Sequence, residues 1–181
     1  DLLGVGDLDL FRQKIERRDR VALAAYGRAC IDVLYSNYRG HDLPLTTVSL
    51  VQGECLGGGF EAALSSDVIV AEKSARFGFP DIYEGSGSAE ALVSRLTRQI
   101  PVAAVHWLVQ TGLLLDAREA HRYCLVNEVV ADGQLEARAR EVAALIAGRP
   151  AAALRAEKQA VIHLENAGYE DATALGAALA A

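Results

Sequence analysis

The stretch Val48-Ser-Leu-Val-Gln-Gly-Glu-Cys-Leu-Gly-Gly-Gly-Phe-Glu-Ala-Ala-Leu-Ser-Ser-Asp67 contains an apolar segment, three consecutive glycines and then a carboxylate. We expect a strand over the apolar segment and a helix that begins after the glycines, near Phe60. Glycines let the backbone approach a ligand closely, and the amides at the start of a helix point outward beside the positive end of its dipole. Glu61, three residues after Gly58, is placed to move a proton. A carbonyl-polarising turn with a carboxylate beside it predicts chemistry on a carbonyl compound.

The composition is that of a globular protein with one sizeable core. The chain has 181 residues, of which 51% are hydrophobic and 23% charged, with a net charge of −6. The negative charge disfavours non-specific binding to nucleic acid. No apolar run approaches the roughly 20 residues of a membrane span, and we find no signal peptide. We therefore expect a cytoplasmic protein with neither nucleic acid nor membrane as a partner.

Several other site classes have no support in the sequence. The three cysteines lack CxxC spacing, so we expect reduced thiols that act as small packing residues. The four histidines lack the paired spacing of metal ligands, which predicts no metal site. The Rossmann, Walker and nucleophile-elbow patterns are absent. The cysteines and histidines are Cys30, Cys55, Cys124, His41, His106, His121 and His163.

Hydrophobic periodicity divides the chain into alternating strands and helices. A long helical region is expected over 8–38, and a capping box is expected from Asp116 to Glu119. Extended segments are predicted over 46–52, 67–72, 75–79 and 126–130, and further helices over 60–66, 86–99, 101–111, 134–147, 151–164 and 169–180. The alternation predicts an α/β core, and the helical end predicts an appended layer.

The ends and loops of the chain show signs of missing residues. The chain begins at Asp1 and contains no methionine, although average usage would give about four in this length. We therefore expect a fragment, or a sequence from which residues have been lost.

The stretch 48–67 and the segments after it resemble the crotonase (enoyl-CoA hydratase/isomerase) superfamily over nearly the whole chain. The later segments that carry the resemblance are Val68-Ile-Val-Ala-Glu72, Ala75-Arg-Phe-Gly-Phe-Pro80, Thr111-Gly112, Asp116-Ala-Arg-Glu-Ala120, Leu125-Val-Asn-Glu-Val-Val130 and Lys158. Within the superfamily, Gly6-Asp-Leu-Asp-Leu-Phe11, the long helical region and the glycine stretch look most like the diffusible-signal-factor synthase branch.

The resemblance implies a ClpP/crotonase-like α/β fold of stacked ββα units with C-terminal helices. Residues 1–130 would form the crotonase core, with part of its N-terminal side missing, and 131–181 a helical region for oligomerisation or for a lid. The resemblance also implies a homotrimer or hexamer. The substrate would be an acyl thioester carried by coenzyme A or acyl carrier protein, with no other cofactor.

The resemblance also implies an oxyanion hole made of two backbone amides. Gly58 supplies one of them, and the turn from Gly4 to Gly6 supplies the other, with Gly6 as our candidate. That turn is shorter than in the family, as if residues were missing between positions 5 and 6. The substrate-binding candidates are Leu56, Gly57 and Phe60.

Two catalytic carboxylates about 20 residues apart are implied by the same resemblance. Glu61 matches the first, and Asp81 stands where the family's hydratases have a second glutamate. The shorter side chain sets its oxygens back by about 1.5 Å, and such a shift can cost on the order of a hundredfold in rate. The following segment is also short near positions 84 and 85, so Glu84 is an alternative second carboxylate.

These residues predict hydration or dehydration at the α,β position of an acyl thioester, between the 3-hydroxyacyl and 2-enoyl forms. The amides would stabilise the enolate oxygen, at about 3 kcal/mol for each donor. Glu61 would move a proton or water at the β-carbon, and Asp81 would assist at the α-carbon. In the synthase version, hydrolysis of the thioester would then release an unsaturated fatty acid signal.

Two other functions remain open. A Δ3,Δ2-enoyl-CoA isomerase can work with one main carboxylate and would tolerate Asp81 better. A catalytically impaired acyl-thioester-binding regulatory protein would keep the oxyanion pocket alone.

Each candidate side chain also has a purely structural interpretation. Glu61 is favoured early in a helix by the dipole, Asp81 is a common turn residue after proline, and Asp67 is expected to be structural. The cations that could hold coenzyme A phosphates, or be ordinary surface charges, are Arg12, Lys14 and Lys158.

Overall fold

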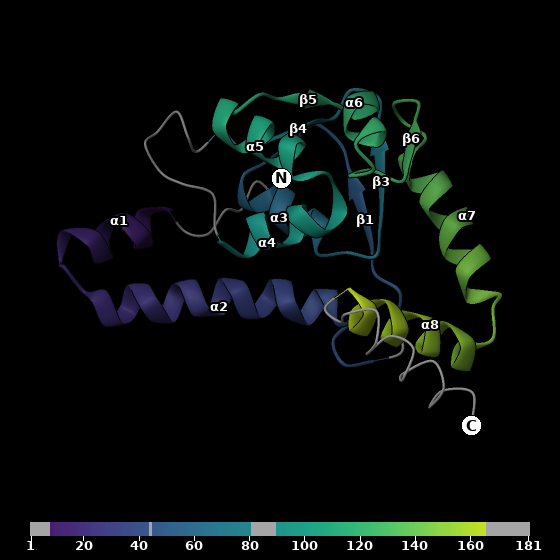
Figure 1. The fold of residues 1–181 in the computed structure, drawn as a ribbon, viewed down its shortest axis with the longest axis horizontal. Coiled ribbons are helices and arrows are strands. Elements are labelled where there is room, and N and C mark those ends of the chain that lie inside the picture. The colour runs from purple at the N-terminus through teal and green to yellow at the C-terminus, as the bar shows by residue number, and fades with distance from the viewer. Residues whose placement is uncertain (1–7, 44, 81–89, 166–181) are drawn as a thin grey trace.

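The computed structural model describes residues 8–43, 45–80 and 90–165, which form two small sheets covered by helices (Figure 1). One sheet has the order β1-β3-β6 and is parallel throughout. The other has the order β2-β4-β5, with β2 and β4 parallel and β5 antiparallel to β4. The strands are β1 (Val48–Val51), β2 (Glu54–Leu56), β3 (Val68–Glu72), β4 (Arg76–Gly78), β5 (Leu115–Asp116) and β6 (Glu128–Val130).

The first four strands alternate between the two sheets, which produces a repeated ββα pattern. β1 and β2 are followed by α3 (Gly58–Leu64), and β3 and β4 precede α4 (Glu90–Gln99). Equivalent strands pair in register, with Val48 opposite Val68 and Leu56 opposite Gly78. The α/β architecture expected from the sequence is therefore confirmed.

The sequence predicted one strand over 46–52 and missed the second strand that follows it. Gly53 has a φ of +69°, a left-handed conformation that glycine adopts without strain. The chain turns there and enters the other sheet as β2. β2 has only three residues, too few to show a period-two pattern, and it is defined by pairing with β4, which comes later in the chain.

Aromatic side chains fill the core between the second sheet and α3. Phe60 is fully buried, and its ring centroid lies 5.1 Å from that of Phe77 and 4.9 Å from that of Phe79. Leu64 from α3 and Leu96 from α4 are buried with them. The core therefore lies directly against the helix that follows the three glycines.

The helical region predicted over 8–38 is two helices, α1 (Leu8–Glu16) and α2 (Arg20–Tyr38). Arg18 has a φ of +52°, which interrupts the helix. Asp19 caps the second helix by accepting a hydrogen bond from the amide of Ala22 at 3.0 Å. No residue of α2 is buried, so the helix contributes less to the core than the spacing of its apolar residues predicted.

The C-terminal helices agree with the predicted ranges where the structure describes them. The capping box is confirmed, since the Glu119 amide donates to Asp116 and the Asp116 amide donates to the Glu119 carboxylate. Helix α7 contacts β1 and β3. The helix predicted over 169–180 and the first residues of the one over 86–99 lie outside the described residues. The observed helices are α5 (Val102–Thr111), α6 (Ala117–Arg122), α7 (Leu135–Ala147) and α8 (Ala151–Leu164).

No helix within the described ranges is both long enough and apolar enough to cross a bilayer.

Candidate active site

The glycine turn lies between β2 and α3 and is attached to the end of β4. Gly57 has a φ of +50° and a ψ of −126°, in the region where a side chain would be strained. Its amide donates a 2.9 Å hydrogen bond to the carbonyl of Gly78. The turn is therefore held against the second sheet, and glycine at position 57 is required by the backbone itself.

The amides of Gly58 and Gly59, at the start of α3, have no partner inside the helix. The amides of Phe60 and Glu61 both donate to the Gly57 carbonyl at 3.0 Å. The amides of Gly58 and Gly59 come before these bonds, in the first turn of a helix, where no intrahelical acceptor exists. Gly58 therefore occupies the position expected of an oxyanion donor, and that role remains a prediction.

Glu61 lies on the same side of α3 as Gly58. It is half-buried in the first turn, three residues after Gly58, a spacing that places two positions on one face of a helix. The positive end of the helix dipole favours an anionic side chain there. A carboxylate and a helix-terminal amide thus lie together, as a proton transfer beside a polarised carbonyl requires.

The candidate substrate contacts differ in exposure. Phe60 is fully buried against Phe77 and Phe79, so its side chain is part of the core that packs against the glycine turn. Leu56 is half-buried at the end of β2. Substrate contacts by these residues, and by Gly57, remain predictions.

The other predicted site residues, Gly6, Asp81 and Glu84, lie outside the described residues. The described chain does reach Pro80, two residues after the Gly78 carbonyl that binds the glycine turn.

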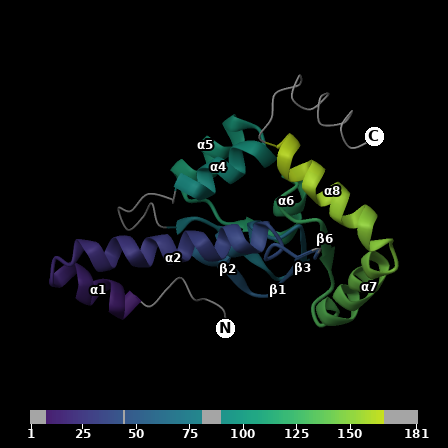
Figure 2. The same ribbon diagram turned by 90° about the horizontal axis from the view of Figure 1, so that it is seen from below.

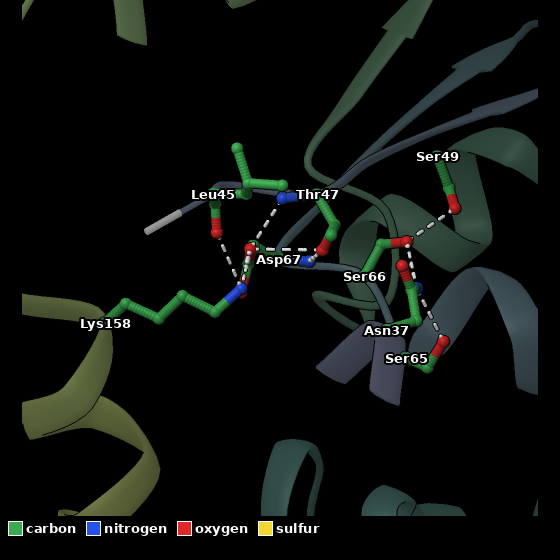
Figure 3. A network of polar contacts seen from close by, with 8 residues as sticks. All are labelled: Asn37, Leu45, Thr47, Ser49, Ser65, Ser66, Asp67 and Lys158. Carbon is green, nitrogen blue, oxygen red and sulfur yellow. Dashed lines mark hydrogen bonds and ion pairs between the residues drawn. The ribbon is translucent and has the colours of Figure 1, made fainter. Parts of the chain in front are cut away.

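A polar network lies near the opposite end of α3 (Figure 3). Oδ2 of Asp67 accepts hydrogen bonds from the amide of Thr47 at 2.7 Å, from the hydroxyl of Thr47 at 3.1 Å and from Nζ of Lys158 at 2.7 Å. Lys158 also donates to the carbonyl of Leu45 at 2.9 Å. These contacts join α8 to the starts of β1 and β3, so Asp67 has the structural surroundings expected of it.

An asparagine connects α2 to the same region. Nδ2 of Asn37 donates to the hydroxyls of Ser65 and Ser66 at 2.8 and 3.0 Å. The hydroxyl of Ser66 also lies 2.8 Å from that of Ser49 (Figure 3). Sequence reasoning missed this connection, and the two adjacent serines after α3 were the only local sign of it.

The three candidate cations for coenzyme A phosphates do not come together. Arg12 and Lys14 belong to α1, and Lys14 lies 3.6 Å from Asp19. Lys158 belongs to α8, and its side chain is only 13% exposed. In both views α1 and α8 lie near opposite ends of α2 (Figures 1 and 2).

The cysteines have contrasting surroundings. Cys55 is buried, and burial raises the pKa of its thiol to about 12. Cys30 and Cys124 are exposed, so the prediction that all three are packing residues is wrong for these two. Cys30 lies on α2, which buries no side chain, and Cys124 lies in a turn with a φ of +61°. Among the described residues, no group of three or more potential ligands could hold a metal ion.

Comparison with known sequences gives one family and relatives of greater length. The model of the family described as enoyl-CoA hydratase/isomerase matches residues 22–177. The chain is 36% identical over 118 residues to a carnitinyl-CoA dehydratase from Salmonella typhi. That alignment covers 65% of this chain and 45% of the relative, so the chain spans about half the length of the curated relatives it matches.

Solved structures of similar proteins confirm the expected fold. The enoyl-CoA hydratase from Thermoplasma volcanium matches with a TM-score of 0.77 and 25% identity, over 85% of this chain and 60% of the other. Human enoyl coenzyme A hydratase domain-containing protein 3 matches with a TM-score of 0.81 over 91% of this chain and 64% of the other. At 20% identity the human protein supports the fold alone. The predicted crotonase-type α/β fold is confirmed.

Proposed function

Because the chain belongs to the enoyl-CoA hydratase/isomerase family, we propose that it adds or removes water between the α- and β-carbons of an acyl thioester. The observation that carries this proposal is the Gly58 amide at the start of α3 with the Glu61 carboxylate in the same helical turn. The relatives named carnitinyl-CoA dehydratase support dehydration as the reaction class.

The Gly58 amide would bind the thioester oxygen. Removal of the α-proton places negative charge on that oxygen, and a preorganised donor there is worth about 3 kcal/mol. The hydrogen bond between the Gly57 amide and the Gly78 carbonyl holds the turn in position before the substrate arrives. Gly6 is our proposal for the second donor.

Glu61 would act as acid or base at the β-carbon, and Asp81 would act at the α-carbon. Dehydration needs one group to take the α-proton and another to protonate the departing hydroxyl. Glu61 is half-buried in the first turn of α3, beside the helix terminus that carries the Gly58 amide.

A finer proposal concerns the product and the carrier. In the signal-synthase version, a 3-hydroxyacyl group on acyl carrier protein is dehydrated and the thioester is then hydrolysed, which releases a 2-enoic acid. We propose no cofactor beyond the carrier, a cytoplasmic location and a homotrimer or hexamer. These points rest on the sequence resemblance.

A Δ3,Δ2-enoyl-CoA isomerase is the second candidate, because Asp81 replaces the expected second glutamate. Isomerisation moves one proton between two carbons and can use one main carboxylate. The binding-protein alternative would retain the Gly58 donor and lack turnover.

Mass-spectrometric product analysis tests the proposal. The purified protein is given 3-hydroxydecanoyl thioesters of coenzyme A and of acyl carrier protein, and 3-decenoyl-CoA in a separate reaction. We expect 2-decenoyl product from the hydroxyacyl substrates, and a rate about 10²- to 10⁴-fold lower for Glu61→Gln. Glu54→Gln is the matched control, because Glu54 is an exposed carboxylate on the adjacent strand.

Each product has a definite meaning. Free 2-decenoic acid that disappears in Glu61→Gln supports the synthase version, and 2-decenoyl thioester without free acid supports a plain hydratase. Conversion of 3-decenoyl-CoA alone supports the isomerase. If Glu61→Gln is as active as the parent protein, the proposed role of Glu61 is wrong. Thioester binding without turnover, even in Asp81→Glu, would support the binding-protein alternative.

A further inference from the structure

A pocket of about 380 Å³ lies between the loop after α2 and one face of α8. This volume is within the range of about 300 to 1,000 Å³ that is typical of small-molecule sites. Lys158 and Leu45, which line the pocket, also belong to the network beyond the C-terminal end of α3 (Figure 3). The glycine turn is at the other end of α3, which is roughly 10 Å long at about 1.5 Å per residue.

The face of α8 toward the pocket has an apolar row and a polar row. Residues four apart lie above one another on a helix, so Leu154 and Ile162 lie in one row with Lys158 between them, and all three are half-buried. The aliphatic side chains of Leu154 and Ile162 are the apolar row. Arg155 and His163 belong to the adjacent row and are exposed. The two aliphatic side chains of this face therefore lie deeper than Arg155 and His163.

The opposite wall adds two large apolar side chains that water still reaches. Leu43 is 56% exposed and Leu45 is 47% exposed. Both line the pocket beside the apolar row of α8. An aliphatic chain seated there would remove this apolar surface from water, which is favourable.

The charges on the lining differ in whether they are already neutralised. Arg39 pairs with Asp42 at 2.6 Å, and Lys158 pairs with Asp67 at 2.7 Å. Arg155 has no ion-pair partner among the residues that the structure describes. The lining thus offers one uncompensated guanidinium beside an apolar floor.

We propose that this pocket binds a medium-chain carboxylate, with the carboxylate on Arg155 and the aliphatic chain between the leucines of the loop and the apolar row of α8. Guanidinium groups bind carboxylates through charge-assisted, often paired hydrogen bonds. The site is separate from the glycine turn, and its occupancy does not depend on the proposed reaction.

Calorimetric titration with sodium hexanoate, octanoate and decanoate tests the proposal. Each added methylene should tighten binding about three- to fourfold until the pocket is filled. Decanol, which has the same chain without the charge, should bind more weakly than decanoate. An affinity independent of chain length, or equal affinity for decanol, would overturn the proposal.

Substitutions locate the binding. Arg155→Ala should weaken decanoate binding about tenfold or more, because it removes the charged donor. Asp42→Asn should tighten decanoate binding, since the substitution removes a negative charge that repels the carboxylate. Asparagine tolerates the left-handed backbone at that position. Arg140→Ala, on the exposed surface of α7, is the control and should change nothing. Circular dichroism and thermal unfolding establish that each variant is folded.

Further outcomes separate this site from the proposed active site. Decanoate binding should be unchanged in Glu61→Gln and undisturbed by coenzyme A. If decanoate binds equally well to the parent protein and Arg155→Ala, or if coenzyme A displaces it, the pocket is not a carboxylate site. If the product assay detects no turnover, the interpretation of these binding measurements does not change.

Discussion

Nζ of Lys158 lies 2.7 Å from Oδ2 of Asp67, across 91 positions of the sequence. Both side chains are largely shielded, at 13% and 27% exposed. The same carboxylate oxygen accepts two hydrogen bonds from Thr47. This ion pair therefore joins the late helix α8 to the point where two parallel strands begin (Figure 3).

Replacement of Lys158 by methionine should lower the free energy of unfolding by about 1–3 kcal/mol, because it leaves a shielded carboxylate without its charged donor. Urea unfolding measures the change. Arg140→Met is the control: its pair with Glu136 is more than three-quarters exposed, and its loss should cost less than about 1 kcal/mol. Equal effects of the two substitutions would contradict the structural role of Lys158.

Phe60→Ala should lower the free energy of unfolding by about 3–5 kcal/mol, since it removes a fully buried ring from between Phe77 and Phe79. Phe60→Leu should cost less, because it retains most of the apolar volume. Chemical denaturation compares the two variants. A cost below about 1 kcal/mol for Phe60→Ala would mean that this ring is not part of the core.

Asp116→Ala should cost about 1 kcal/mol, because Asp116 caps α6 through the Glu119 amide. This hydrogen bond holds the pKa of Asp116 below its ordinary value. Because the folded pKa is depressed, the stabilisation is complete above the ordinary pKa of about 3.9 and is lost as the pH falls through the folded pKa.

Unfolding curves at a series of pH values test the capping prediction. The difference between the parent protein and Asp116→Ala should be constant near neutral pH and should shrink below about pH 4. Asp116→Asn keeps a capping oxygen and should be less destabilised at pH 7 than Asp116→Ala. A difference that grows in acid would show that the carboxylate is not the stabilising form.

Thiol labelling should distinguish the cysteines. With iodoacetamide at pH 8, Cys30 and Cys124 should react in the folded protein because both are exposed. Cys55 should react only after unfolding, since it is buried and its pKa is raised to about 12, which leaves almost no thiolate. Peptide mass mapping identifies the labelled positions, and rapid labelling of Cys55 in the native protein would contradict its placement.

Much of the candidate site could be predicted because its signals are local. Gly57 is required by its own backbone conformation, and Glu61 follows Gly58 by one helical turn. The capping box at Asp116 also lies within four consecutive residues. Elements specified within a few residues can be recognised without knowledge of the fold.

Other parts depended on contacts between distant segments. The division of 46–56 into strands of different sheets followed from pairing with β3 and β4, which come later in the chain. The full burial of Phe60, chosen from the sequence as a substrate contact, depends on rings contributed by β4 and the residue after it. The exposure of Cys30 depends on α2 burying no side chain.

The sequence by itself determined the glycine turn, the carboxylate beside it and the capping box at Asp116, since these arise from backbone freedom and helix periodicity over short spans. Only the tertiary structure decided which strands share a sheet, that Lys158 contacts Asp67, and that a pocket forms against α8. Those features need contacts between distant segments, and the contact between Lys158 and Leu45 spans 113 positions. Contacts between distant segments are set by the packing of the whole core, which no short stretch of sequence specifies.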